Sequence, residues 1–237
     1  MKTFLKAKWQ NLIMVNYEID PTYLLPYLPK GVDLDYYNGK TYISLVGFLF
    51  KDSSLFKIPI PLFGTFEEIN LRFYVTRKIG TEVKRGVVFI NETVPNKTVA
   101  WVANKLYKEH YTSIPTKHKW KIDANYKEIE YEWMVNKKWN CLKVIATTNA
   151  LNIRVGSLEE FIFEHYFGYT KVDPTQSIEY KINHPSWLIN EIKAHTITCN
   201  FSDFYGEHFK ILNSTNPHSI MLAEGSDITI DWKRTKF

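Results

Sequence analysis

Residues 66–77 read FEEINLRFYVTR, and the clearest indication of the chain's fold comes from this stretch. Alternate side chains of a β-strand lie on the same face. The stretch therefore predicts a strand with one apolar face and one polar face. The apolar face carries Ile69, Leu71, Phe73 and Val75, and the polar face carries Glu68, Asn70, Arg72 and Tyr74.

The polar face has two interpretations, which differ in where it points. On a strand that faces solvent, Glu68 and Arg72 belong to an ordinary cross-strand surface of mixed charge. Inside a barrel, buried charges must be paired and hydrogen-bonded. An ion pair of Glu68 with Arg72 inside the barrel can bind a carboxylate, a phosphate or a polarised carbonyl group. The four polar residues are therefore the candidate ligand-binding residues, and both interpretations stay open.

Further strands are predicted on both sides of this stretch. Residues 86–94 follow a short polar link and should form its antiparallel neighbour. The Asn38-Gly39 pair, which tolerates positive φ, joins a strand at 34–37 to another at 41–50. The proline-spaced residues 57–64 predict an extended connector. Alternating segments predict later strands at residues 119–123, 128–135, 141–146, 177–183, 193–200 and 228–232, with a turn at Gly225 before the last.

Two principal helices are predicted among these strands. Apolar residues recur at helical spacing through residues 98–111. The second helix begins at Ser157, where Ser157 and Glu160 fit a capping box, and its apolar stripe ends at Gly168. Asp20 and Pro21 also predict the start of a short helix. The expected fold class is α+β, with a predominantly antiparallel sheet, as one domain over residues 1–237.

The composition predicts a folded, cytoplasmic chain. Hydrophobic residues make up 45% of the 237 residues, which is enough apolar surface to offset the chain entropy lost on folding. The start of the chain has no signal-peptide pattern, and the two cysteines, at 141 and 199, suggest free thiols. The net charge of +5 comes from scattered basic residues. We therefore expect no nucleic acid and no membrane as partners, and leave a homo-oligomer open.

Three residues outside the strand are candidate catalytic groups. His110 and His165 can donate or accept protons near neutral pH, and Tyr111 can stabilise an oxyanion. Tyr107 lies on the same predicted helix as His110 and Tyr111 and joins the ligand-binding candidates. A lone histidine is also an ordinary hydrogen-bonded core residue, and that alternative stays open.

The familiar catalytic and cofactor motifs are missing from the sequence. It contains no glycine-rich phosphate loop, no GxSxG elbow and no HExxH pair. Its seven histidines never occur as two metal ligands at helical spacing on one element. We therefore expect no cofactor and no bound metal.

Several segments, in order along nearly the whole chain, resemble the YqjF-like family of uncharacterised bacterial proteins. They are KWQNLIMVNYEIDPTYLLPYLPKGVDLD (8–35), YISLVGFLF (42–50), FEEINLRFYV (66–75), GVVFINETVP (86–95), EEFIFEHYFGYT (159–170), HPSW (184–187) and LAEGS (222–226). These proteins are similar in fold to acetoacetate decarboxylase. The resemblance implies a curved antiparallel sheet that closes into a cone-like barrel with a central cavity.

The same resemblance allows the catalytic residues of acetoacetate decarboxylase to be compared with this sequence. Acetoacetate decarboxylase uses a Schiff-base lysine with a neighbouring lysine that lowers its pKa. The similar segment here is NKLYKEHYTSIP (104–115), in which Tyr111 matches the tyrosine, but Thr112 and Ser113 stand where the lysine pair is expected. Glu68 and Arg72 fall on the strand that carries the relatives' cavity glutamate. The resemblance thus implies a cavity without the decarboxylase nucleophile.

Three functions remain open from the sequence. The first is a protein that binds a small anionic or carbonyl-bearing organic molecule in the barrel, with Arg72 as anion anchor and Glu68 as its ion-pair partner. The second is a lyase, isomerase or hydrolase acting on a small organic acid. The third is a structural or oligomeric interaction protein.

Overall fold

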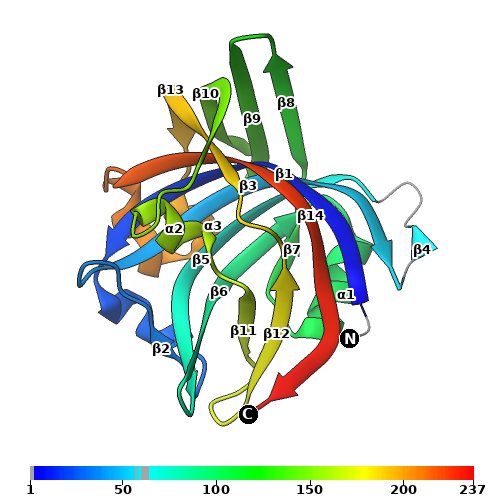
Figure 1. The fold of residues 1–237 in the computed structure, drawn as a ribbon, viewed down its shortest axis with the longest axis vertical. Helices are drawn as coiled ribbons and strands as arrows, with labels where there is room; N and C mark the ends of the chain where they lie inside the picture. The colour runs from blue at the N-terminus through cyan, green and yellow to red at the C-terminus, as the bar shows by residue number, and fades with distance from the viewer. Residues whose placement is uncertain (1–2, 57, 60–63) are drawn as a thin grey trace.

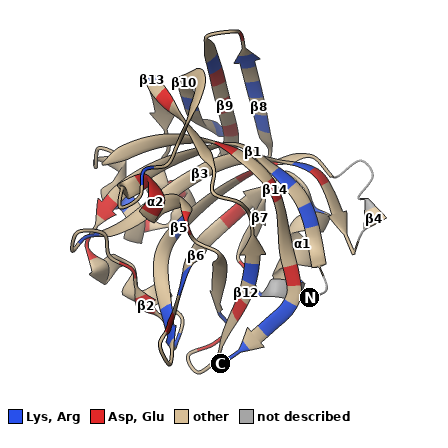
Figure 2. Ribbon diagram, in the orientation of Figure 1, with Lys and Arg blue, Asp and Glu red and all other residues tan. Residues whose placement is uncertain are grey.

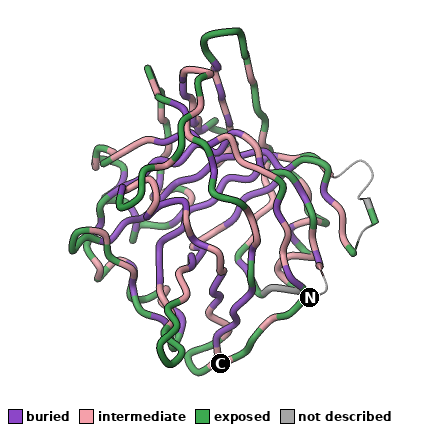
Figure 3. Tube along the Cα trace, viewed as in Figure 1, coloured by how far each residue is buried: buried purple, intermediate pink, exposed green. Residues whose placement is uncertain are grey.

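The stretch at residues 66–77 forms strand β5 (Phe66–Ile79), as predicted. It pairs antiparallel with β3 (Thr41–Leu55) on one side and with β6 (Glu82–Val94) on the other. The computed structural model describes residues 3–56, 58–59 and 64–237, and within it both faces of β5 are buried through the middle of the strand (Figure 3).

Seven strands form a closed barrel (Figure 1). Their order around it is β1 (Thr3–Ile19), β3, β5, β6, β11 (Phe167–Lys171), β12 (Ser177–Asn183) and β14 (Ser219–Lys236), and β14 pairs with β1 to close the ring. Only the short β6–β11 contact in this ring is parallel among the described residues. The expectation of a predominantly antiparallel, curved sheet that closes into a barrel is confirmed.

The sheet continues beyond the barrel and covers part of its outer wall. From β14 it runs through β13 (Leu188–Thr198), β10 (Lys138–Asn152), β9 (Tyr126–Val135) and β8 (Thr116–Ile122). Three short strands add to other edges: β2 (Asp33–Leu34) to β5, β4 (Ile58–Pro59) to β3, and β7 (Tyr111–Ser113) to β6.

Two hydrophobic clusters follow from this arrangement. The first fills the barrel, where Tyr74 of β5 meets side chains of β1, β3, β12 and β14. The second lies outside the barrel wall, where Ile69, Leu71, Phe73 and Val75 meet β9 and β10. The apolar face of β5 therefore points out of the barrel, and its polar face points in.

Helices are few and short. They are α1 (Lys97–Tyr107), α2 (Leu158–Phe163), α3 (Phe201–Tyr205) and the 3-10 turns η1 (Pro21–Tyr23), η2 (Leu25–Tyr27) and η3 (Glu207–Asn213). Ser157 caps α2 by accepting a hydrogen bond from the Glu160 backbone amide at 3.2 Å, as predicted. Asp20 caps η1 in the same way through Thr22. None of the helices in the described ranges is long and apolar enough to cross a membrane.

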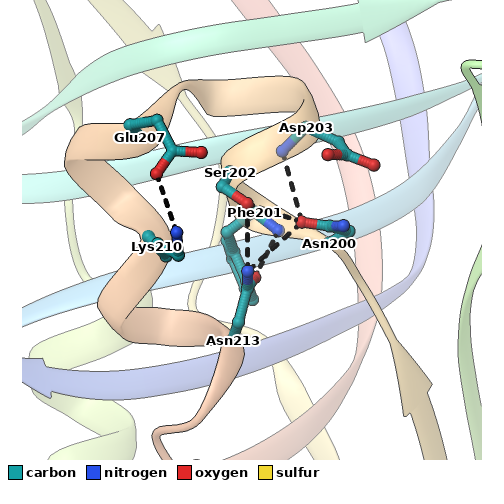
Figure 4. A network of polar contacts seen from close by, with 7 residues as sticks. All are labelled: Asn200, Phe201, Ser202, Asp203, Glu207, Lys210 and Asn213. Atoms are coloured by element: carbon teal, nitrogen blue, oxygen red, sulfur yellow. Dashed lines mark hydrogen bonds and ion pairs between the residues drawn. The ribbon is translucent and has the colours of Figure 1, made fainter.

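A small network of side-chain amides joins the start of α3 to the end of η3 (Figure 4). The Asn200 side chain accepts a hydrogen bond from the Asp203 backbone amide, and the Asn213 side chain accepts one from the Phe201 amide at 2.7 Å. Asn213 also donates to Asn200 at 3.2 Å. The network fixes the two short helices so that Phe201 and Phe209 are buried in the outer cluster.

Both principal helices are shorter than predicted. α1 ends at Tyr107 because Lys108 adopts a left-handed conformation, with φ of 60°, and the Asn104 side chain pairs with both backbone groups of Tyr111. His110 therefore lies outside the helix, and Tyr111 begins β7. α2 stops at Phe163, so Gly168 is not a helix stop and lies in β11 opposite Tyr180.

Further predictions from the sequence concern two turns, a connector and the cysteines, and not all of them are confirmed. Asn38 and Gly39 form the expected tight turn with positive φ, but only a single bridge between Tyr37 and Lys40 flanks it. Gly225 was wrongly expected at a turn, because it lies inside the long strand β14 with φ of 80°. The predicted connector at 57–64 falls largely outside the described residues. The cysteines at positions 141 and 199 are free and half-buried.

Candidate functional site

The polar face of β5 is inside the barrel. Glu68, Asn70, Arg72 and Tyr74 are between 1% and 7% exposed. Charged residues elsewhere are spread over loops and over strands such as β8, β12 and β14 (Figure 2). Most charged side chains in the described part of the chain are not buried, whereas those of Glu68 and Arg72 are. The structure thus excludes the solvent-facing interpretation of this face.

Glu68 lines a cavity of about 180 Å³ at one end of the barrel, beside α1. Most of its wall is apolar and comes from β1, β3, α1 and β14, including Phe4, Phe50, Val99, Val102 and Ile230. Its ionisable lining groups among the described residues are Glu68, Glu109, Tyr111 and Tyr180. Lysine is absent from this described lining, so no described residue there can form an imine.

Glu68 is held by two donors. Asn70 donates to its Oε1 at 3.0 Å, and the Tyr111 hydroxyl donates to its Oε2 at 3.2 Å. Burial penalises the charged form and raises the pKa of Glu68 to about 7, although both hydrogen bonds act in the opposite direction. Near neutral pH this carboxyl group therefore changes between acid and base.

Two further glutamates are buried near Glu68. Glu109, which follows α1, accepts hydrogen bonds on Oε1 from Thr170 at 2.6 Å and Tyr180 at 2.8 Å. Its pKa is raised to about 7, chiefly by burial and also by the Glu68 charge. Burial, with the charges of Glu109 and Glu68, raises the pKa of Glu92 on β6 well above its usual range.

The expected ion pair of Glu68 with Arg72 does not form. No ion pair between described residues involves Arg72, whose guanidinium lies 3.4 Å from the Ile162 carbonyl oxygen and 3.6 Å from the Met14 sulfur. Its Nε has no hydrogen-bond partner in the described part of the chain. Arg72 is absent from the described cavity lining, because four positions along β5 carry it toward α2. Its role as an anion anchor stays a prediction.

His165 and Tyr74 form a separate buried group. The Tyr74 hydroxyl lies 2.6 Å from Ser44 Oγ, and its ring centre lies 4.8 Å from that of His165. His165 Nε2 is 3.5 Å from Asp35. Burial lowers the pKa of His165 to about 4, so the imidazole is neutral at pH 7. The structure does not bring His165 to the Glu68 cavity.

The remaining candidates lie in different places. His110 is exposed and lines a second cavity, of about 150 Å³, whose wall also includes Glu109. Tyr111 lines the Glu68 cavity, whereas the Tyr107 side chain lies outside the described part of the structure. Of the predicted site residues, the structure therefore groups Glu68, Asn70 and Tyr111.

Glu92, Glu109 and Tyr180 were missed by the sequence analysis. Glu92 is hidden by a register shift: Leu71 pairs with Asn91 but Arg72 pairs with Phe89, so Ile90 is an extra residue in β6. Strict alternation would place Phe89 and Glu92 on opposite faces, and this bulge brings them to the same one. Glu109 was expected on a helix over residues 98–111, and nothing in the sequence of that helix indicated that the Glu109 side chain is buried.

The three glutamates do not form a metal site. Among the described residues, no group of three or more histidines, cysteines, aspartates or glutamates is arranged to hold a metal ion. The chemistry that this arrangement supports is hydrogen bonding and proton transfer by carboxyl and hydroxyl groups.

Comparisons with known proteins agree with this architecture. The chain is 24% identical to the uncharacterized protein YqjF of Bacillus subtilis (strain 168), over 85% of this chain and 81% of that protein. In structure it resembles an acetoacetate decarboxylase-like enzyme from Sphingomonas wittichii RW1, with a TM-score of 0.66, 12% identity and coverage of 100% and 94% of the two chains.

A further structural neighbour is the enduracididine biosynthesis enzyme MppR complexed with pyruvate. Its TM-score is 0.65 at 8% identity, with coverage of 100% of this chain and 91% of that one. At such low identity these likenesses show the fold alone, which is that of the acetoacetate decarboxylase-like barrels. A model of the uncharacterized conserved protein family DUF2071 matches residues 6–227, and the chain belongs to that family.

Proposed function

We propose that the barrel cavity binds a small, uncharged, carbonyl-bearing organic molecule. The observation that carries this proposal is an apolar cavity into which Glu68, Glu109 and Tyr111 bring carboxyl and hydroxyl groups. A site of this kind, mostly apolar with a few polar groups, is typical of small-molecule pockets. The apolar wall favours a hydrocarbon body, and the polar groups favour one hydrogen-bonding oxygen.

The charge of the site favours a carbonyl compound over an anion. Three buried carboxyl groups lie near one another, and an added negative charge would be repelled by whichever of them is ionised. The nearby buried cation, Arg72, is outside the described lining. A protonated carboxyl group and a tyrosine hydroxyl can both donate to a carbonyl oxygen. The pyruvate complex of MppR, which has a similar fold, supports a ligand with a carbonyl group, and pyruvate carries a carboxylate as well.

The size of the cavity limits the ligand. An engineered apolar cavity of about 150 Å³ accepts benzene, and the cavity here is about 180 Å³. A six-membered cyclic ketone such as cyclohexanone therefore suits the volume, the apolar wall and the donor groups.

Titration calorimetry with cyclohexanone tests this proposal. We expect wild-type protein to bind cyclohexanone and to bind cyclohexanecarboxylate at least about tenfold more weakly, since one repelled charge costs about 1.4 kcal/mol or more. The variant Ala103→Phe puts a ring into the cavity wall on α1 and should abolish binding. Lys97→Phe adds the same ring at an exposed position of that helix and should leave binding unchanged.

Two results contradict the proposal. One is wild-type protein that does not bind cyclohexanone, and the other is undiminished binding by the Ala103→Phe variant. Tighter binding of the carboxylate than of the ketone would instead favour the anion-binding alternative, with Arg72 as anchor.

A further inference from the structure

We propose that the cavity catalyses proton transfer at the carbon atom next to the carbonyl group of its ligand, with Glu109 as the base and Glu68 as the proton donor. This inference rests on the proposed function for its ligand class. It adds a reaction, keto–enol interconversion, which needs neither a lysine nor a metal ion.

Glu109 is built to act as a fixed base. It is 7% exposed, and the Thr170 and Tyr180 hydroxyls both donate to its Oε1. Hydrogen bonds to a carboxylate favour its ionised form, and here they come from two different strands, β11 and β12. Because both donors contact Oε1, Oε2 is the oxygen on which Glu109 can accept a proton from the ligand.

Glu68 belongs to a chain of acidic groups that can supply a proton. Its Oε2 accepts a hydrogen bond from the Tyr111 hydroxyl, and that hydroxyl also interacts with Glu92. Glu92 is 3% exposed, and its Oε2 has no hydrogen-bond partner among the described residues. A buried carboxyl oxygen without a partner is costly when charged, so Glu92 stays protonated and can donate to Tyr111.

Mutual repulsion keeps at least one proton in the site. Glu68 on β5, Glu92 on β6 and Glu109 before β7 are all buried, and each ionisation makes the next more difficult. The other ionisable groups around them in the described part of the chain are Tyr111 on β7, Tyr180 on β12 and, farther along β5, Arg72. The second cavity, which Glu109 also lines, adds His110, Tyr169 and Lys171. Near neutral pH one of the two cavity carboxyl groups is ionised and the other protonated, which is the state that acid–base catalysis requires.

The reaction balances within the site. Glu109 Oε2 takes a proton from the carbon next to the carbonyl group, and the electron pair of that C–H bond forms a C=C bond. The π electrons of the C=O bond move to oxygen, which takes a proton from Glu68. Glu109 is then protonated, Glu68 is ionised and the ligand is an enol. A tyrosine and a protonated carboxyl group together stabilise such a developing oxyanion in ketosteroid isomerase.

Deuterium exchange measures this reaction directly. Cyclohexanone is incubated with the protein in D₂O, and the loss of its α-hydrogen signal is followed by proton NMR. We expect exchange well above the buffer rate. Glu109→Gln should lower the rate at least about 100-fold, since a general base contributes about 10²–10⁴-fold, while calorimetry shows that cyclohexanone is still bound. Glu207→Gln, a change in a 77%-exposed side chain, should leave the rate unchanged.

The pH profile of the wild-type protein is a second, independent measurement. The exchange rate should pass through a maximum near pH 7, because both carboxyl groups are protonated at low pH and both are ionised at high pH. A rate that rises steadily with pH, or an undiminished rate in Glu109→Gln, would contradict the inference. Bound cyclohexanone without exchange also overturns it and leaves the proposed binding intact, whereas absence of binding overturns the proposed function itself.

Discussion

The protonation of one site residue, Glu109, also contributes to the stability of the folded protein. Its carboxyl group is buried and its pKa is raised to about 7 from an ordinary 4.5. The folded chain therefore holds this proton more tightly than the unfolded chain. The resulting stabilisation is fully present below the unfolded pKa and is lost as the pH rises from about 4.5 to about 7.

We predict that Glu109→Gln flattens the dependence of stability on pH. Glutamine cannot titrate, so the variant should lose a contribution of up to about 3 kcal/mol that changes between pH 4.5 and 7. Urea unfolding of wild type and variant at several pH values measures the difference. Relative to wild type, the variant should gain stability as the pH rises through this range. A difference that does not change with pH would show that Glu109 titrates normally.

At the scale of elements, the β1–β14 seam closes the barrel. A methyl group at Gly225 of β14 would lie 2.0 Å from the Trp9 carbonyl oxygen of β1. The two strands can approach this closely only because position 225 has no side chain. Gly39, in the turn before β3, has a similar positive φ of 77° but nothing within 4 Å of an added methyl group.

We predict that Gly225→Ala destabilises the protein by about 1–3 kcal/mol more than Gly39→Ala does. Both variants are destabilised by an alanine at positive φ. The difference between their free energies of unfolding therefore measures the clash between β1 and β14. Equilibrium unfolding in urea measures it, and equal losses in the two variants would show that β1 and β14 separate without cost.

At the scale of the whole molecule, the outer layer packs against the outer face of the barrel wall through the second hydrophobic cluster. Leu142 of β10 and Tyr131 of β9 pack at Gly47 of the barrel strand β3. The Tyr131 hydroxyl also donates to the Asn11 carbonyl oxygen of β1 at 3.0 Å. The buried Lys127 of β9 pairs with Glu224 of β14 at 2.5 Å. These contacts favour one cooperative unit over residues 1–237.

We predict a single unfolding transition for the whole chain. Far-UV circular dichroism and tryptophan fluorescence should give the same urea midpoint. Leu142→Ala, which empties a fully buried position between the layers, should lower both midpoints together at a cost of about 2–5 kcal/mol. Two midpoints, of which only one moves, would show that the outer strands form a separate domain.

Much of the fold could be predicted because its signals are local. The alternation of β5 depends only on the order of residues 66–77, and the cap at Ser157 depends on its hydroxyl meeting a nearby amide. β1 was not predicted, although it forms half of the closing seam. The predicted ends of both helices were wrong. Asn104 hydrogen-bonds to Tyr111, and Gly168 pairs with Tyr180 in the sheet. The spacing of apolar residues along a helix gives no information about such contacts.

From the order of its residues alone, the chain shows a strand with one polar face at residues 66–77 and no lysine pair at residues 112–113. The curved sheet around this strand was implied by the resemblance to the YqjF-like family. That this face points inward, and that Glu92 and Glu109 lie near Glu68, follows from the three-dimensional structure and not from the local sequence. The physical reason is that burial is set by pairing between distant strands. Which carboxyl groups are buried depends on the pairing of β14 with β1 and on the bulge at Ile90. Burial in turn raises the pKa of those carboxyl groups.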